Sequence, residues 1–332
     1  MITAEERQPA WSRRGSNIQG LGISEGMAKA GIDFEVGIYP LHASVPTLWT
    51  SPDEEPICMS EKVANYQLTY RKDTLTPIAP VGARYHVVQT REAVSMIEAM
   101  SLTGWSPEFG GSLRRGAAVF MAGKLDVELQ TGEIDPYLCF VNSFDGSSGV
   151  KFACTPLRPH CTNQVRAIFA KRGKNTERPV VSLRHTSKVM DRVDYVASIL
   201  GLTSAYYKYL DIQIDKLLNT ELTGERTEQV LDVIAPLTVK GRELEGRALE
   251  GRQEKRAQVL VNLQNSKTIP NTQRSTAWGL YNSITELEQW GRDQYPTAQQ
   301  SEQLLGSHLS IMPVTMTSDR VYRVMDRWLQ PA

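Results

Sequence analysis

The sequence lacks several features that mark common protein classes. It has only four cysteines in 332 residues, which is too few for the disulfide framework of a small secreted domain. No apolar run reaches the roughly 20 residues that a membrane-spanning helix needs, and the first residues have no apolar core of a signal peptide. A cytoplasmic location without a membrane partner is therefore expected.

Motifs for common enzyme chemistry are also missing. There is no G-x-x-x-x-G-K-[ST] phosphate loop, no G-x-G-x-x-G after a strand and no G-x-S-x-G elbow. Ser147 follows Asp145-Gly146 and is better explained by a turn than by nucleophilic catalysis. The spacing of Cys154, His160, Cys161 and His185 matches no standard zinc pattern. No cofactor is expected, and no motif indicates magnesium.

The composition is that of an ordinary folded protein. Hydrophobic residues make up 41% of the chain and charged residues 22%, which permits a sizeable core and argues against disorder. Basic and acidic residues balance at 37 each, so the formal net charge is zero.

The charge is unevenly distributed along the chain. Between Lys151 and Arg192 there are ten basic and two acidic residues, which is an excess of eight positive charges in a neutral protein. A local excess of this kind is typical of a surface that binds a polyanion. The alternative is a counter-charge from the protein itself, which the Glu-containing segments of residues 221–255 could supply within the chain or across a subunit interface.

Hydrophobic periodicity predicts an α+β fold with an antiparallel sheet, packed helices and a helical C-terminal region. The Asp145-Gly146 pair marks a hairpin turn, and Gly123 marks a bulge or a close backbone approach. Residues 43–60 are rich in Pro and Ser and are expected to form a loop. Strand patterns fall at 33–39, 65–71, 85–89, 105–109, 117–125, 137–144 and 149–154, and helical patterns begin at Thr90 and cover 159–171, 193–218, 225–234, 276–290 and 319–329.

Three regions are expected along the chain. Residues 1–35 resemble a polar N-terminal arm, residues 36–188 form the basic α+β core and residues 189–332 form the helical region. Within the last, residues 240–256 are charged, with a glycine followed by arginine every five residues. An interior glycine costs a helix about 1 kcal/mol relative to alanine, so this segment is expected to be a marginal helix or a mobile loop.

Several segments carry a resemblance to a known family. They are Gly20-Leu21-Gly22, the RYHV segment at 84–87, PYLCFVNSFDGSSGVKFACTPLRPHCTNQ from Pro136, SLRHT at 182–186 and TAWGLYNSITELEQW at 276–290. In order and spacing they resemble the phage- and plasmid-borne proteins grouped as domain of unknown function 932. Relatives usually have a histidine where this chain has Phe144, and that departure favours a binding role over catalysis.

A more distant resemblance links the strand-rich basic core, followed by helices, to phage single-strand annealing proteins of the RecT, Redβ and ERF kind. That resemblance implies rings or filaments of identical subunits that hold single-stranded DNA in a basic groove without ATP. It also implies an exonuclease as a possible protein partner, and the cytoplasm of the host cell as the location.

Our hypothesis is an oligomeric protein that binds single-stranded DNA and anneals complementary strands without a nucleotide cofactor. Tyr70, Tyr85 and Phe152 lie near basic residues and could stack on bases, although such aromatics are also common in sheet cores. One alternative is a metal-dependent nuclease or other phosphoryl-transfer enzyme, which would need Asp135, Asp145 and Asp191 to converge beside His185. Another is a structural or host-interaction protein whose basic patch is an oligomer interface. The expected DNA-binding residues are Arg114, Arg115, Lys124, Lys151, Arg158, Arg166, Lys171, Arg172, Lys174, Arg184 and His185.

Overall fold

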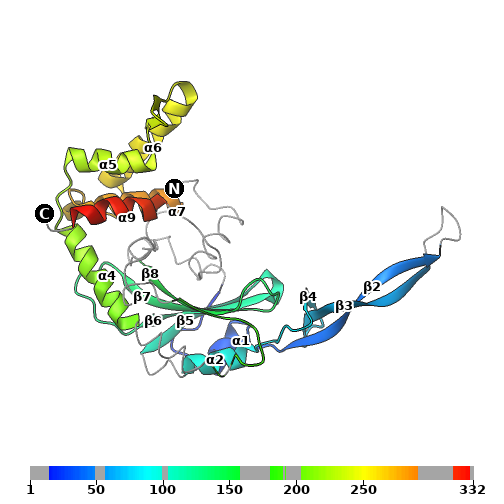
Figure 1. The fold of residues 1–332 in the computed structure, drawn as a ribbon. Helices are drawn as coiled ribbons and strands as arrows, with labels where there is room; N and C mark the ends of the chain where they lie inside the picture. Colours follow the sequence, from blue (N-terminus) through cyan, green and yellow to red (C-terminus); the bar gives the residue numbers. More distant parts are fainter. Residues whose placement is uncertain are drawn as a thin grey trace.

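A six-stranded antiparallel sheet is the centre of the fold (Figure 1). The structure is a computed structural model, and it describes residues 15–48, 57–98, 104–157, 180–189, 191, 203–290 and 317–329. The predicted α+β class is confirmed, because antiparallel sheets are combined with helices on the sheet and towards the C-terminus.

The six strands follow the order β1-β5-β6-β7-β8-β9, and each neighbouring pair is antiparallel. The predicted hairpin is confirmed as β7 and β8, and Gly146 in its turn has a φ of 73°, which glycine adopts without strain. The strands are β1 (Ser16–Asn17), β5 (Trp105–Leu113), β6 (Ala118–Leu125), β7 (Asp135–Ser143), β8 (Val150–Leu157) and β9 (Val180–Leu183).

Both faces of this sheet are apolar, since side chains alternate between two buried clusters. One face contacts α1 (Ile23–Lys29) and α2 (Thr90–Glu98). Glu92 accepts a hydrogen bond from the backbone N–H of Gln89 at 2.7 Å, which satisfies one of the free donors at the start of α2. The cluster on the other face consists of Phe120, Ala122, Tyr137, Cys139, Val141 and Leu157.

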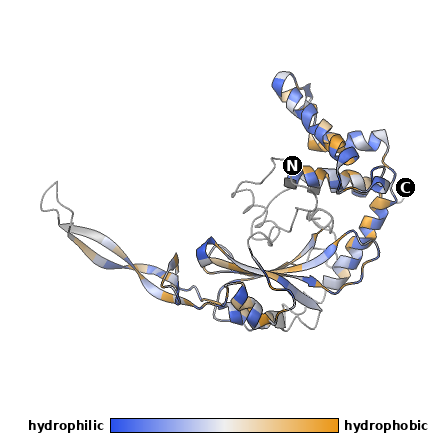
Figure 2. Cartoon of the chain, turned by 180° about the vertical axis from the view of Figure 1, so that it is seen from behind, coloured by the Kyte–Doolittle hydropathy of each residue, from blue (hydrophilic) through white to orange (hydrophobic). Residues whose placement is uncertain are grey.

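A long two-stranded ribbon projects from the body of the molecule (Figure 1 and Figure 2). Its strands are β2 (Val36–Leu48) and β3 (Ile57–Arg71), which we call the arm, and β4 (Pro77–Gly82) pairs only with Tyr66 to Tyr70 at its base. The expected loop at residues 43–60 is therefore wrong at both ends. Ser44, Pro46 and Ser60 lie on paired strands of the projecting ribbon, where no alternating apolar pattern is required, and residues 49–56 lie outside the described residues.

The C-terminal helices form a group that α4 (Thr203–Leu218) joins to the sheet. α5 (Gly224–Ile234) packs against α9 (Thr317–Trp328), and α7 (Ala277–Trp290) packs against α6 (Gly246–Asn265), α9 and α4. A short hairpin of β10 (Thr238–Val239) and β11 (Arg242–Glu243) precedes α6. In the described part of the chain, no helix combines the length and the apolar character that crossing a membrane requires.

Buried polar contacts attach the helices to the sheet. The Asp211 carboxylate on α4 accepts hydrogen bonds from the backbone N–H groups of Gln130 and Thr131, in the connection between β6 and β7. In the same connection, Glu133 accepts from Gln273 at 2.5 Å and from the Trp278 indole at 2.8 Å. The helices therefore pack back on the sheet.

Three local expectations differ from the structure. Residues 16–35, expected to belong to a polar arm, contribute β1, α1 and the buried side chains of Ile18, Met27 and Ile32. Residues 85–89 do not form a strand; Val87 and Val88 are buried there, but by the segment that leads into α2. The charged segment at 240–256 divides into the β10–β11 hairpin and the first half of α6.

Candidate nucleic-acid interface

Six of the eleven expected DNA-binding residues lie in the described part of the chain, namely Arg114, Arg115, Lys124, Lys151, Arg184 and His185. The other five, Arg158, Arg166, Lys171, Arg172 and Lys174, lie outside the described residues. The predicted basic helix at 159–171 and the first part of the predicted helix at 193–218 also lie outside them.

Lys124 and Lys151 share one face of the sheet. Side chains alternate along β6, so Lys124 lies on the face of Phe120 and Ala122. Lys151 is paired with Val141, which belongs to the same buried cluster. The strands therefore place both lysines on the face that α1 and α2 leave uncovered, which we call the lysine face.

Acidic groups on the lysine face offset part of its charge. Lys124 forms an ion pair with Asp135, at the start of the neighbouring strand. The Tyr137 hydroxyl donates a 2.6 Å hydrogen bond to Glu108, and burial together with this carboxylate raises the pKa of Tyr137. The charges in the middle of the lysine face therefore nearly cancel. The unpaired positive charge of the candidate interface lies outside this face.

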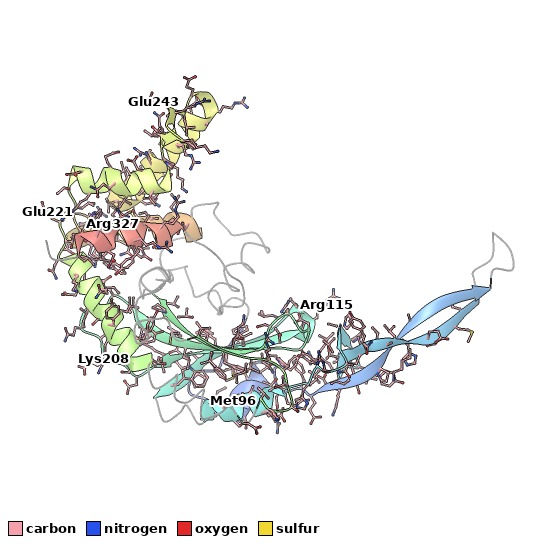
Figure 3. All side chains as sticks on the ribbon, in the orientation of Figure 1. Met96, Arg115, Lys208, Glu221, Glu243 and Arg327 are labelled. Atoms are coloured by element: carbon pink, nitrogen blue, oxygen red, sulfur yellow. The ribbon has the colours of Figure 1, made fainter. Side chains whose placement is uncertain are left out.

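Arg114 and Arg115 form the tight turn between β5 and β6. Their φ angles are 51° and 58°, a left-handed conformation that is uncommon for residues with a side chain. Arg114 forms an ion pair with Asp145 at 2.9 Å and donates to the Ser147 hydroxyl at 3.1 Å. Arg115 lies at the end of the sheet nearest the arm (Figure 3). Its side chain is exposed and has no ion-pair partner among the described residues.

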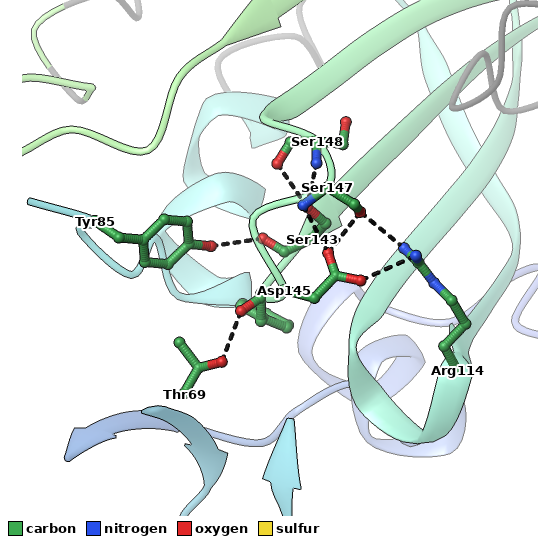
Figure 4. Close-up of polar contacts among 8 residues, drawn as sticks. Thr69, Tyr85, Arg114, Ser143, Asp145, Ser147 and Ser148 are labelled. Atoms are coloured by element: carbon green, nitrogen blue, oxygen red, sulfur yellow. Dashed lines mark hydrogen bonds and ion pairs between the residues drawn. The ribbon is translucent and has the colours of Figure 1, made fainter. Parts of the chain in front are cut away.

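The turn between β7 and β8 is held by a hydrogen-bond network (Figure 4). The Asp145 carboxylate accepts from both the backbone N–H and the hydroxyl of Ser147, and the Ser143 hydroxyl donates to the Ser148 carbonyl at 2.5 Å. Tyr85 donates from its hydroxyl to the Ser143 carbonyl at 2.9 Å. The turn reading of this Asp-Gly-Ser segment is supported, because its polar groups are used to fix the turn.

Arg184 reaches the same turn from β9. A Cβ atom on Gly149 would lie 2.0 Å from the Leu183 carbonyl oxygen and 3.4 Å from the Arg184 backbone nitrogen, so these backbones touch. Arg184 is exposed, and no partner for its side chain is found within the described residues. Two segments that are far apart in the sequence thus place three arginines at the same end of the sheet, beside the β7–β8 turn. We call this end the arginine end, and its arginines are Arg114, Arg115 and Arg184.

His185, the neighbour of Arg184, is buried, with 7% of its surface exposed. Its ring stacks on Tyr85 at a centroid distance of 4.9 Å, and neither ring nitrogen has a hydrogen-bond partner in the part of the chain that the structure describes. Burial lowers the pKa of His185 to about 4, although the His86 main chain and the Asp145 charge partly oppose this shift. The ring is therefore neutral at pH 7, and its expected DNA contact stays a prediction that this burial does not favour.

The carboxylates that a nuclease would need do not come together. Asp135 begins β7 and Asp145 follows its end, which separates them by roughly 30 Å along the extended strand. Asp191 is exposed beyond His185. Within the described ranges there is no group of three or more His, Cys, Asp or Glu residues that could hold a metal ion.

The sequence does not indicate two contacts of the site. Tyr85, a candidate for base stacking, instead stacks its ring on His185 and donates from its hydroxyl to the Ser143 carbonyl. Asp145, a candidate turn residue or nuclease carboxylate, pairs with Arg114. A signal for this pairing was present in the sequence. The Arg-Arg turn and the Asp-Gly turn are separated by two consecutive antiparallel strands, β6 and β7, which places both turns at the same end of the sheet.

The fold and site define an α+β protein with a basic end on an antiparallel sheet. The chain belongs to the family described as Domain of unknown function (DUF932), whose model matches residues 77–309. The expected family membership is thereby confirmed. No curated protein and no solved structure matches the chain, so the distant resemblance to single-strand annealing proteins is not confirmed.

Proposed function

We propose that this protein binds single-stranded DNA at the arginine end and promotes annealing of complementary strands as an oligomer without ATP. The proposal places it in the cytoplasm of the host cell. The supporting observation is that Arg114, Arg115 and Arg184 are gathered at one hairpin end, where Asp145 is the acidic residue that contacts Arg114. Arg115 and Arg184 are exposed and remain available to phosphate.

The chemistry of the arginine end suits a phosphate backbone. Arginine offers several N–H donors in a planar fork that matches phosphate oxygens. Contacts to phosphate position a strand without reading its bases. A strand held in this way keeps its base edges free, and those edges can then pair with a second strand.

The direct test is fluorescence anisotropy of a labelled single-stranded oligonucleotide with the full chain, at several salt concentrations and with duplex DNA alongside. The log of the affinity should fall with the log of the salt concentration, with a slope of about −0.7 for each phosphate neutralised. The double variant R115E/R184E should reduce the magnitude of this slope by roughly 1.4, because two contacts are lost.

The matched control is R242E/R247E, which makes the same change in net charge at two exposed arginines of the helical group. It should leave the slope unchanged. Equal effects of the two double variants would show that only overall charge matters and would reject the arginine end. Absence of binding at low salt would reject the proposal, and DNA cleavage after addition of magnesium or manganese would favour the nuclease alternative.

A further inference from the structure

Among the described strands, only β4 supports the arm, and it does so at the base alone. β4 pairs with β3 only between Tyr66 and Tyr70, whereas the β2–β3 pairing continues out to Leu48 and Ile57. A two-stranded ribbon is at best marginally stable in water unless it packs against something else. At about 3.3 Å per residue, the 13 residues of β2 span roughly 43 Å.

One face of the arm is aromatic and exposed. Tyr39 is paired with Leu68, and Tyr66 is two residues from Leu68 on the same strand, so both tyrosines lie on one face. They are 61% and 52% exposed, and the Tyr39 ring lies 6.4 Å from that of His42. Tyrosine is enriched in protein interfaces, where it adds much contact area for little conformational entropy.

The charge of the arm argues against nucleic acid as its partner. From Val36 to Tyr70 the described strands contain one acidic residue, Glu61, and one basic residue, Lys62. Lys72 at the base is paired with Glu35, and Arg71 is paired with Asp73. A strand-binding surface needs a series of free cations beside its aromatic residues, and the aromatic face lacks them.

The β2 edge of the arm is poorly suited to strand addition. β2 carries Pro40 and Pro46, which have no backbone N–H, and the pairing with β3 shifts register at both positions. Prolines and bulges on an edge strand discourage pairing with a further strand. A partner is therefore not expected to add a strand along β2, whereas the exposed tyrosines offer side-chain contacts on the face of the arm.

We infer that the arm packs its aromatic face on a second copy of this chain, in an exchange where each copy receives the arm of the other. A ribbon of two strands is about 10 Å wide, and β2 beyond the buried Val36 and Gly37 spans 11 residues, so one face covers roughly 360 Å². A reciprocal exchange buries that area on two arms and on two receiving surfaces, roughly 1,450 Å² in all, which is within the range of a standard stable interface.

Overall charge does not oppose this assembly. The formal net charge is zero, so two copies have no long-range repulsion to overcome. The arm exchange specifies the contact that forms the proposed oligomer. It rests on the proposed function only for the existence of that oligomer. Self-association needs no DNA, and DNA binding at the arginine end needs no arm, so either idea can fail without the other.

The test is sedimentation-velocity analysis of the full chain between about 1 and 100 μM, a range that covers typical micromolar association. The wild type should sediment as a dimer or larger species. Y39S/Y66S should weaken association at least ten-fold, and M59Q, at a residue that is 54% exposed further along the arm, should weaken it to a smaller extent. These side chains are exposed, so circular dichroism should show an unchanged fold.

The matched control is I212S on α4, which removes an exposed apolar side chain of similar exposure, 54%, away from the arm. It should associate like the wild type. A monomeric wild type, or Y39S/Y66S that assembles normally, overturns the arm exchange. If Y39S/Y66S assembles normally but loses binding to single-stranded DNA, the arm is a nucleic-acid surface instead.

Discussion

His185 illustrates how a residue of the expected site acquires a structural role. The residue is 7% exposed, its ring stacks on Tyr85, and neither ring nitrogen has a hydrogen-bond partner among the described residues. A neutral imidazole is tolerated there, whereas a charged one would be buried without a partner. The residue therefore ties β9 to the segment before α2, whereas its neighbour Arg184 is exposed.

This environment predicts a pH dependence of stability. The folded-state pKa of His185 is about 4, below the ordinary value of 6.5, so the unfolded chain binds more protons between those values. Stability from the neutral ring is complete above pH 6.5 and is lost as the pH falls through 4. We expect H185F, which keeps the stacked ring, to reduce the loss of unfolding free energy between pH 7 and pH 4 by roughly 2–3 kcal/mol.

Urea denaturation at both pH values measures this difference. H42Q, at an exposed histidine of the arm, is the control and should follow the wild-type curve. If H185F loses as much stability on acidification as the wild type, the buried ring does not titrate as the structure indicates.

At the scale of elements, α6 shows that repeated glycines need not have the same role. Gly251 lies inside the helix, and a Cβ atom there would meet nothing within 4 Å. Gly246 also lacks close neighbours, but its φ of 55° is a conformation that alanine adopts only with strain. The five-residue repeat of the sequence thus covers two different backbone requirements.

We expect G251A to raise the free energy of unfolding by about 0.5–1 kcal/mol, because alanine is the better helix former and restricts the unfolded chain. G246A should lower it by about 1 kcal/mol or more through backbone strain. Thermal denaturation of the two variants provides a matched comparison. Equal effects would mean that the start of α6 is an ordinary helical turn.

The sequence predicts those strands and helices in which burial of one face produces a clear hydrophobic period. Strands β5 to β8, the turn at Asp145-Gly146 and the close approach at Gly123 all emerge from local patterns, and a Cβ atom at Gly123 would lie 2.3 Å from the Ser106 carbonyl oxygen. The strand patterns at 33–39 and 65–71 indicate only the base of the arm, because its outer strands are exposed on both faces and have no alternation. Pairing of Arg114 with Asp145 depends on strand register, which composition does not determine.

At the scale of the whole molecule, Glu133 links the sheet to the helical group. Its carboxylate accepts from Gln273 and from the Trp278 indole, and both donors are buried. E133A should lower the free energy of unfolding by roughly 3 kcal/mol, because two buried donors lose a charged acceptor. E133Q, which keeps one acceptor oxygen, should have a smaller effect.

Hydrogen exchange of β7 and α7 tests whether this link makes the molecule unfold as one unit. Both elements should exchange together in the wild type, and α7 should exchange first in E133A. E128Q, at an exposed carboxylate in the same connection, is the control. Independent exchange of β7 and α7 in the wild type would contradict a cooperative link.

The two prolines of β2 have a consequence for the behaviour of the protein at high concentration. An exposed ribbon of this length would ordinarily act as a template on which further strands stack into fibrils. Pro40 and Pro46 interrupt the row of donors that such growth requires. We therefore expect fibril growth by strand addition along β2 to be disfavoured even at high protein concentration.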